Sequence, residues 1–365
     1  MPPVVILDTN ALYGRKPFTQ ANSALLLALS EFGHVRLVVP EVVLLELSRQ
    51  WAGEVQDNAA AARTGVKKLN EALVDVEVER VTLDLPEFDR SVYYDYAKKL
   101  FHAKGAEVPP PPPEVSVRDL LDKEIEVRKP FARQGTGFRD ALIWETVREV
   151  CDGLEDPGTP VVFVTNNHKD FCDKTGGNLH PDLRQDLAGG QRFDIVSSLH
   201  HLLEHEAVAP LVKTFRVLGG TFTSERLAEI VDRAITDLHG VNVEEALGVY
   251  IGDGMYEVPI STGLDSATFE EIMHEGDTIA SEIYRAGDEL TVCVTVNADC
   301  SFNGFVDKGE YFSNDEVASY SFLENWNDYI FRASVRRWLR FTFSATFTED
   351  TRDDVVLSLD AAEEL

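Results

Sequence analysis

The feature that most constrains the fold is a short apolar run that ends abruptly on a carboxylate. Val4–Leu7 contains four apolar residues, and Asp8 follows directly. A run of this length predicts a short strand that is buried on both faces. Ligands of open α/β sheets bind beyond the carboxyl ends of the strands, so Asp8 would stand where chemistry usually takes place. Asp8-Thr9-Asn10 equally suits the cap of a helix that begins near Ala11, and the run alone leaves both interpretations open.

Similar apolar runs recur and alternate with helical patterns. Val35–Val39, Val161–Val164 and Phe193–Val196 predict further strands, and Val78–Leu83 is long enough for another short one. Helices are predicted for Ala21–Phe32, Pro40–Leu47, residues 53–75, Asp89–Lys104, Val117–Val127, Phe138–Val150 and Leu199–Glu206. This alternation is typical of an α/β fold in which helices cover both faces of a parallel sheet. The first domain is therefore expected to have three layers and to span residues 1–210.

The pattern changes near residues 210–222, and we expect a second, α+β domain over residues 215–365. Glu225–Leu238 has the apolar spacing of an amphipathic helix. Leu290–Val296, Phe341–Phe347 and Val355–Leu359 then alternate between apolar and polar residues. This alternation predicts antiparallel strands with one face in water.

The net charge of −29 is unevenly distributed along the chain. The segment from Thr214 onward holds 30 acidic and 10 basic residues, whereas residues 1–213 hold 33 acidic and 24 basic ones. An acidic surface repels nucleic acid, because affinity for nucleic acid depends largely on phosphate contacts with Lys and Arg. Any nucleic-acid site is therefore expected in the N-terminal part. A sensing, regulatory or protein-binding role is expected for the acidic C-terminal part.

Cysteine spacing and hydropathy predict a cytoplasmic location. The four cysteines form no CxxC pair and show no paired zinc-ligand spacing, which favours a reducing compartment. No basic segment precedes an apolar run at the N-terminus, and no apolar stretch approaches about 18 residues. We therefore expect neither secretion nor a membrane partner.

Four carboxylates occupy comparable places next to the predicted strands. Asp8 follows the first strand, Glu46 lies on the helix after the second, Asp140 begins a helix, and Asp170 lies beyond Val161–Val164. Parallel strands bring their carboxyl ends to one edge, where converging carboxylates would have raised pKa values unless cations neutralise them. Oxygen ligands of this kind suit Mg²⁺ or Mn²⁺. The pattern predicts metal-dependent phosphoryl chemistry.

These segments together resemble the PIN-domain ribonucleases. The resemblance rests on Val4–Asn10, Pro40–Leu47, Gly137–Trp144 and Val161–Phe171, in this order and spacing, and covers roughly residues 1–205. The chain looks most like bacterial PIN proteins with a long helical insertion, here about residues 53–130, which includes the five prolines Pro109–Pro113. We expect those prolines to act as a stiff spacer, although such a run also suits an SH3-type ligand.

The resemblance implies a metal-dependent endoribonuclease and assigns roles to several residues. Asp8, Glu46 and Asp140 match the metal-binding acids of the family. At the fourth acidic position this chain has Asn167, which would coordinate metal through its side-chain carbonyl but brings no charge, and Asp170, three residues later, would replace it. Asn10 and Thr165 would orient water or a carboxylate.

Phosphate attraction is expected from a basic island between Arg118 and Arg139. It contains six basic and four acidic residues, and Arg128, Lys129 and Arg139 are the candidates for RNA contacts. Lys169, next to Asp170, is a further candidate. An ordinary charged helix with pairs at i,i+4 explains the same residues equally well.

Other functions of the same chain are kept as alternatives. The rival to an endoribonuclease is a catalytically weak PIN-like scaffold that binds RNA or a protein partner, and Asn167 in an acidic position favours it. The resemblance further suggests a toxin or defence effector with a regulatory or antitoxin protein partner, and homodimerisation is left open. Haloacid-dehalogenase phosphatases require a second aspartate at the position of Asn10, so this class is rejected.

Overall fold

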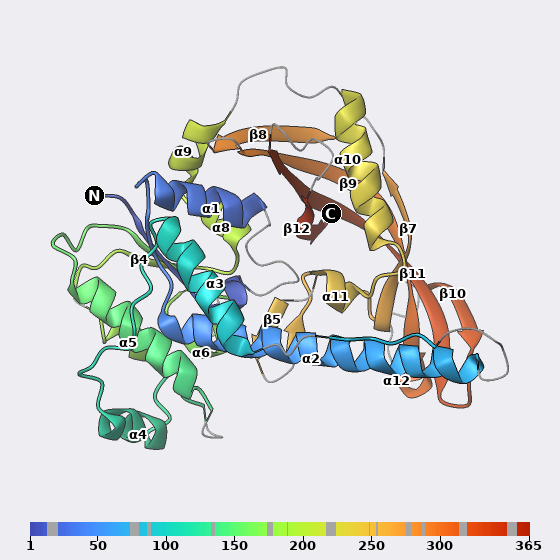
Figure 1. The fold of residues 1–365 in the computed structure, drawn as a ribbon, viewed down its shortest axis with the longest axis horizontal. Coiled ribbons are helices and arrows are strands. Elements are labelled where there is room, and N and C mark those ends of the chain that lie inside the picture. The colour runs from blue at the N-terminus through green and yellow to red at the C-terminus, as the bar shows by residue number, and fades with distance from the viewer. Residues whose placement is uncertain are drawn as a thin grey trace. The chain divides into compact units, whose positions relative to one another are not determined.

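Figure 1 shows the computed structural model of the protein as a ribbon. Four short strands form the predicted parallel sheet in the order β2-β1-β3-β4. They are β1 (Val4–Leu7), β2 (Arg36–Val38), β3 (Val161–Val164) and β4 (Phe193–Val196). All residues of β1 and β3 are buried, as their uninterrupted apolar sequences predict. The four strands and their parallel arrangement are confirmed, and so is the α/β class of this part.

The structure describes residues 1–12, 21–73, 80–85, 89–132, 136–173, 178–187, 189–216, 224–247, 249–252, 255–274, 279–286, 289–313, 320–348 and 356–365. The chain divides into two compact units, each built from several segments. The first unit contains Met1–Leu12, Val35–Phe163 and Lys169–Asp194, and the second contains Tyr13–His34, Val164–His168 and Ile195–Leu365. Because both units are discontinuous in sequence, the domain boundary near residues 210–215 stays a prediction.

The helices of the first unit follow the sequence pattern closely. They are the 3-10 helix η1 (Thr9–Ala11), α2 (Glu41–Ala72), α3 (Arg90–Ala103), α4 (Val117–Ile125), α5 (Phe138–Asp152) and α7 (Pro181–Arg184), while α6 (His168–Phe171) begins at the last residue of a second-unit segment. Aromatic rings of Trp144, Phe163, Phe171 and Phe193 pack against one another in its core, with centroids 5.0–6.5 Å apart. These contacts hold α5 and α6 against the strands.

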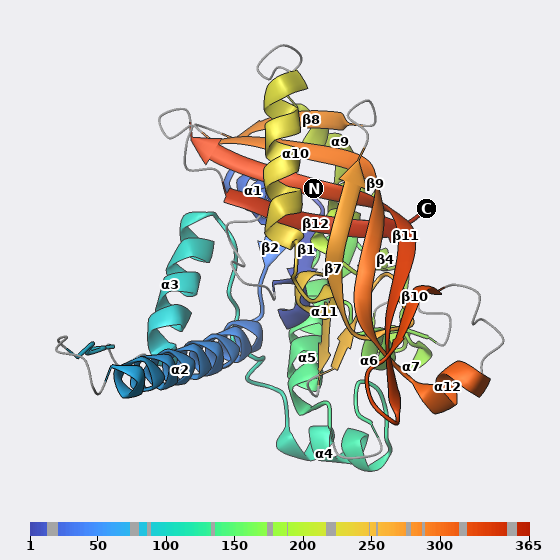
Figure 2. The ribbon, with the colours of Figure 1, turned by 90° about the vertical axis from the view of Figure 1, so that its right-hand side faces the viewer.

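One prediction in this unit was wrong at α2. The sequence suggested separate helices over Pro40–Leu47 and residues 53–75, but Glu41–Ala72 is a single helix of 32 residues, with Pro40 as its N-cap rather than its first residue. The intervening residues contain no proline, and the alanine-rich stretch has high helix propensity. Trp51 stacks on Tyr93 at a centroid distance of 5.3 Å, which packs α3 against α2 (Figure 2).

The further strand suggested at Val78–Leu83 is not formed by residues 80–83, and residues 78 and 79 lie outside the described ranges. The side chain of Asn70 explains the difference. Its Oδ1 accepts from the backbone N–H of Val81 at 2.9 Å, and its Nδ2 donates to the Val81 carbonyl at 2.7 Å. Both groups that a strand would use for pairing are thereby satisfied locally.

The second unit contains the predicted antiparallel sheet, in the order β10-β11-β9-β7, with β8 paired to β9 and β12 paired to β11. Its strands are β7 (Asp265–His274), β8 (Ala280–Ala286), β9 (Glu289–Asp307), β10 (Tyr320–Asn325), β11 (Ile330–Thr348) and β12 (Val356–Glu364), beside the hairpin of β5 (Val249–Gly252) and β6 (Met255–Glu257). β9 and β11 pair along their full length, from Ile330↔Asp307 to Thr348↔Glu289. Both strands are longer than the predicted segments Leu290–Val296 and Phe341–Phe347, because the alternation of apolar and polar residues continues beyond them.

Helices α10 and α1 both pack on this antiparallel sheet. The apolar stripe of α10 (Ser224–Leu238) joins the buried core formed by β9 and β11 (Figure 2). Helix α1 (Ala21–Glu31) comes from the N-terminal part of the sequence but contacts β8, β9 and β11. The unit also holds α8 (Leu199–Glu204), α9 (Ala209–Val212), η2 (Lys213–Phe215), α11 (Val243–Leu247) and α12 (Lys308–Ser313). In the described ranges, no helix combines the length and apolarity needed to cross a membrane.

Candidate functional site

Asp8 stands where the sequence placed it, directly after β1. Its carboxylate Oδ1 accepts the backbone N–H of Thr9 at 2.6 Å, and it is the N-cap of η1. The residue is buried, with 3% exposure. Asp8 therefore caps a helical turn and also lies at the carboxyl end of a central strand, so the two interpretations of the sequence are compatible.

Glu46 is held on α2 by two partners that come from other parts of the first unit. The hydroxyl Oγ1 of Thr9 donates to Oε2 of Glu46 at 3.0 Å. The guanidinium of Arg139 donates to Oε1 of the same carboxylate. The Glu46 side chain is 11% exposed and the Arg139 side chain 53% exposed. A largely buried carboxylate is thus neutralised by a cation that reaches it from solvent.

Asp140 lies in the first turn of α5, directly after the turn that ends at Gly137. Burial, together with the charges of Asp8, Asp170 and Glu46, raises the pKa of its carboxyl to about 7, against the opposing charge of Arg139. Only carboxylates that lie near one another couple in this way. The structure therefore brings the four predicted acids into one electrostatic neighbourhood.

Asp170 is paired with Lys129. The ammonium Nζ of Lys129 lies 3.1 Å from Oδ1 of Asp170 and donates to the backbone carbonyl of Lys169 at 2.6 Å. Both side chains are mostly buried, with 21% exposure for Lys129 and 16% for Asp170. The fourth acid is therefore neutralised by a cation of the chain itself.

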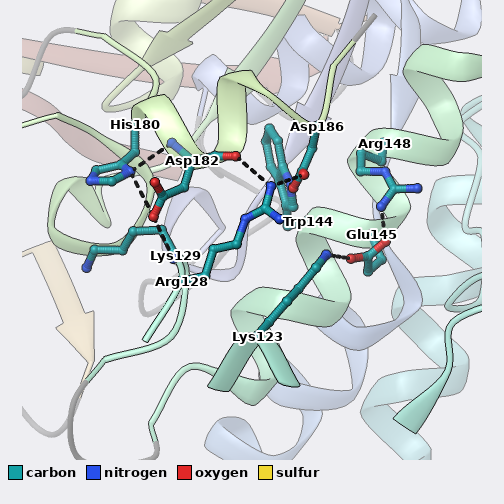
Figure 3. A network of polar contacts seen from close by, with 9 residues as sticks. All are labelled: Lys123, Arg128, Lys129, Trp144, Glu145, Arg148, His180, Asp182 and Asp186. Atoms are coloured by element: carbon teal, nitrogen blue, oxygen red, sulfur yellow. Dashed lines mark hydrogen bonds and ion pairs between the residues drawn. The ribbon is translucent and has the colours of Figure 1, made fainter. Parts of the chain in front are cut away.

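A polar network fixes the backbone that carries Lys129 (Figure 3). Asp186 accepts from Arg128 at 2.5 Å and from Nε1 of Trp144 at 3.0 Å, so it links the loop to α5. Arg128 also donates to the carbonyl of Asp182 at 3.1 Å, and the Asp182 carboxylate accepts the backbone N–H of Lys129 at 3.2 Å. These bonds fix the backbone at Lys129, and the bonds of its ammonium to Asp170 and to the Lys169 carbonyl hold the side chain.

Figure 3 also shows a second ion-pair group on α5. The Glu145 carboxylate accepts from Lys123 of α4 at 2.5 Å and from Arg148 at 3.0 Å. Glu145 is buried, with 8% exposure, and the two cations offset the cost of burying its charge. This group ties α4 to α5.

The basic candidates for RNA binding are mostly engaged with carboxylates. Arg128 is bound to Asp186, Lys129 to Asp170, and Arg139 to Glu46. Lys169 is exposed. Arg133 of the basic island lies outside the described residues. Of the three engaged cations, Arg139 is the most exposed, and it is therefore the one placed best to exchange its carboxylate for a phosphate.

The remaining predicted residues are divided between the two units. Asn10 is half-buried in η1 of the first unit. Thr165 and Asn167 follow β3 and belong to the second unit, where the backbone N–H of Asn167 donates to Oγ1 of Thr165 at 3.0 Å. Both are buried. Their predicted roles in orienting water or holding metal stay predictions.

The donor set fits a hard divalent cation in its chemistry. Asp8, Glu46 and Asp140 offer carboxylate oxygens, and their mutual repulsion is what a cation relieves. As the side chains stand, however, no three His, Cys, Asp or Glu residues in the described part of the chain are arranged to hold a metal ion. In the same arrangement two of the four acids are paired with cations of the chain, Glu46 with Arg139 and Asp170 with Lys129.

Sequence reasoning did not identify Thr9 or Asp186. Thr9 fixes the orientation of Glu46, and Asp186 fixes the loop before α5. Thr9 stands inside the Asp-Thr-Asn segment, so its position beside Asp8 was a usable signal. Asp186 gave no such signal, because its partners are 42 and 58 residues away in the sequence.

Comparison with known protein families gives a match to the PIN domain. Residues 5–171 match the family model of the PIN domain, which includes Asp8, Glu46, Asp140 and Asp170. No curated protein and no solved structure matches the chain.

Proposed function

Residues 5–171 of this chain are a PIN domain, and from this premise we propose that the protein is an endoribonuclease that depends on Mg²⁺ or Mn²⁺. PIN domains are in general nucleases that use divalent metals and act on RNA. The observation that carries the proposal is the electrostatic coupling of Asp140 to Asp8, Glu46 and Asp170. Clustered carboxylates at the end of a parallel sheet have an energetic cost that a bound cation removes.

Each side chain of the site has a distinct role in this proposal. Asp8, Glu46 and Asp140 would hold the metal ion, and Thr9 keeps the Glu46 carboxylate in place. The bound ion would supply a more acidic water and would stabilise negative charge on the phosphodiester. Arg139, released from Glu46, would contact an RNA phosphate. Asn10, Thr165, Asn167 and Lys169 are proposed as supporting residues on the basis of sequence alone.

Cleavage of a fluorescent single-stranded RNA tests this proposal. We expect cleavage with Mn²⁺, none with a chelator, and a loss of at least about 100-fold in Asp8→Asn. Asp57→Asn is the matched control, because Asp57 is exposed on α2. Equal cleavage by the wild-type protein and the Asp8→Asn variant would refute metal-dependent catalysis at this site.

A catalytically weak scaffold is the second candidate, and the pairing of Glu46 and Asp170 with cations favours it. In that case the ion pairs are permanent, and the domain binds RNA or a protein partner without cleaving RNA. Calorimetric titration with Mn²⁺ separates the two candidates. The nuclease requires binding in the micromolar to millimolar range, whereas the scaffold predicts none.

A role as a cytoplasmic toxin or defence effector is a finer proposal that depends on the nuclease activity. It predicts that induced expression of the wild-type chain arrests bacterial growth and that Asp8→Asn does not. A regulatory or antitoxin partner would restore growth when co-expressed. Light scattering of the purified chain decides whether it forms a homodimer.

A further inference from the structure

We infer that Lys129 is a permanent counter-cation of the site, that Asp170 is its anchor rather than a metal ligand, and that the site therefore takes one divalent ion. This inference rests on the proposed function. It concerns how many ions bind and which carboxylates hold them.

The two cations that contact the acids differ in their exposure to solvent and in the number of acceptors that they bind. Lys129 has 21% side-chain exposure and gives its ammonium to two acceptors, Oδ1 of Asp170 at 3.1 Å and the carbonyl of Lys169 at 2.6 Å. Arg139 has 53% side-chain exposure, and its one described acceptor is Glu46. An exposed guanidinium returns to water at little cost, whereas removing a mostly buried ammonium from two acceptors is expensive.

The backbone at Lys129 is held in place by hydrogen bonds to other parts of the first unit. Its N–H is bound to the Asp182 carboxylate at 3.2 Å, and the preceding Arg128 is bound to Asp186 at 2.5 Å. Asp186 is itself bound to Trp144, whose side chain is fully buried in the core (Figure 3). The lysine is thus attached to a rigid framework, and a metal ion entering the site would displace Arg139 before Lys129.

The formal charge of the site also favours one divalent ion. Asp8, Glu46, Asp140 and Asp170 supply four carboxylates, and Lys129 is the cation that stays, which leaves a formal charge of −3 once Arg139 is displaced. One divalent ion reduces this charge to −1. A second ion would give the site an excess of positive charge and would compete with Lys129 for Asp170.

Counting bound Mn²⁺ by electron paramagnetic resonance of the full-length protein tests the inference without relying on activity. We expect one ion per chain in the wild type and in Lys129→Arg, and two in Lys129→Met, where Asp170 is free to bind the second. Asp170→Asn should keep one ion with affinity within about three-fold of the wild type. Lys67→Met, at an exposed position of α2, is the control for loss of one lysine and should keep one ion. Thermal melts of each variant establish that it is folded.

Each outcome distinguishes this inference from the proposed function. Two ions in the wild type, or one ion in folded Lys129→Met, would overturn the role of Lys129 and leave metal-dependent cleavage intact. Loss of the ion in Asp170→Asn would show that Asp170 is a ligand and would also overturn it. A wild-type chain that binds no Mn²⁺ would refute the proposed function itself.

Discussion

The hydroxyl of Thr9 and the carboxylate of Glu46 are joined by a hydrogen bond of 3.0 Å between residues that are 37 positions apart in the sequence. This bond connects the turn after β1 to the second turn of α2. It fixes one oxygen of Glu46 and leaves the other to Arg139. Two of the acids assigned to the metal site are thereby coupled, because the backbone N–H of Thr9 also donates to Asp8.

Thr9→Val should weaken metal binding without unfolding the chain. Valine keeps the shape of threonine but removes the hydroxyl, so Glu46 loses a fixed orientation. A hydrogen bond of this kind contributes about 1 kcal/mol, and we expect about five-fold weaker Mn²⁺ binding. Calorimetric titration measures the change. Thr64→Val, which removes an exposed hydroxyl bonded within α2, is the control and should bind Mn²⁺ as tightly as the wild type.

Asp140→Asn should flatten the pH dependence of stability in metal-free protein. The pKa of Asp140 is about 7 in the folded chain and roughly 3.9 in an unfolded one. Between these two pKa values Asp140 has lost its proton in the unfolded chain but keeps it in the folded chain. The free energy of unfolding therefore falls as the pH rises from about 4 to about 7. Asparagine has no such proton. At pH 8 the Asp140→Asn variant should therefore have a higher melting temperature than the wild type. Thermal melts of both proteins in chelator at pH 5 and pH 8 measure this difference. No difference between the proteins at pH 8 would contradict the shifted pKa.

Gly137→Ala should destabilise the turn that leads into α5. Gly137 has φ 106°, and an added Cβ would lie 2.6 Å from the carbonyl oxygen of Pro130. Backbone strain and this clash together should lower the free energy of unfolding by roughly 2 to 4 kcal/mol in denaturant titrations. Gly65→Ala provides the comparison, because Gly65 lies within α2 and an added Cβ would meet no atom within 4 Å. That variant should be stabilised by up to about 1 kcal/mol.

Asp360→Asn should stabilise the antiparallel sheet at high pH and leave it nearly unchanged at low pH. Both carboxyl oxygens of Asp360 are buried, and in the described structure neither accepts a hydrogen bond of good geometry, although the hydroxyls of Ser344 and Ser358 lie nearby. Burial raises its pKa to about 7, and the hydroxyls of Ser344 and Ser358 offset this only in part. Above pH 7 the folded wild-type chain must hold a buried charge at Asp360, which the variant lacks. The free energy of unfolding of the variant, relative to the wild type, should therefore be about 1 to 3 kcal/mol larger at pH 8 than at pH 5. Denaturant titrations at both values measure it, with the exposed Glu363→Gln of β12 as control.

The sequence predicted the four strands of the parallel sheet and parts of β9, β11 and β12, because the burial of these strands follows local sequence patterns, but it did not predict β7, β8 or β10. β1 and β3 are uninterrupted apolar runs, and β9 and β11 alternate with period two. At α2 it divided one helix into two, because the apolar period of Pro40–Leu47 does not continue beyond Trp51, where the helix has no buried residue. The alanine-rich composition, rather than periodicity, held the information there.

The four acids could be singled out from their places after strands, but their partners could not. Arg139 is 93 residues from Glu46, and Lys129 is 41 residues from Asp170. Only the folded chain shows that these basic residues neutralise carboxylates. The sequence assigned both to RNA phosphates, because charge patterns along a chain do not reveal which groups meet across it.

The position of α1 has a consequence for how the protein is made. Leu25, Leu26 and Leu29 are each at most 2% exposed, and the helix that carries them packs on β8, β9 and β11. A ribosome releases residues 21–31 long before it has synthesised the strand that ends at Thr348. During that interval the leucines have no final binding surface and are open to chaperones or to aggregation. Any truncation that removes the antiparallel sheet would make this exposure permanent, so the PIN domain should be produced with the whole chain.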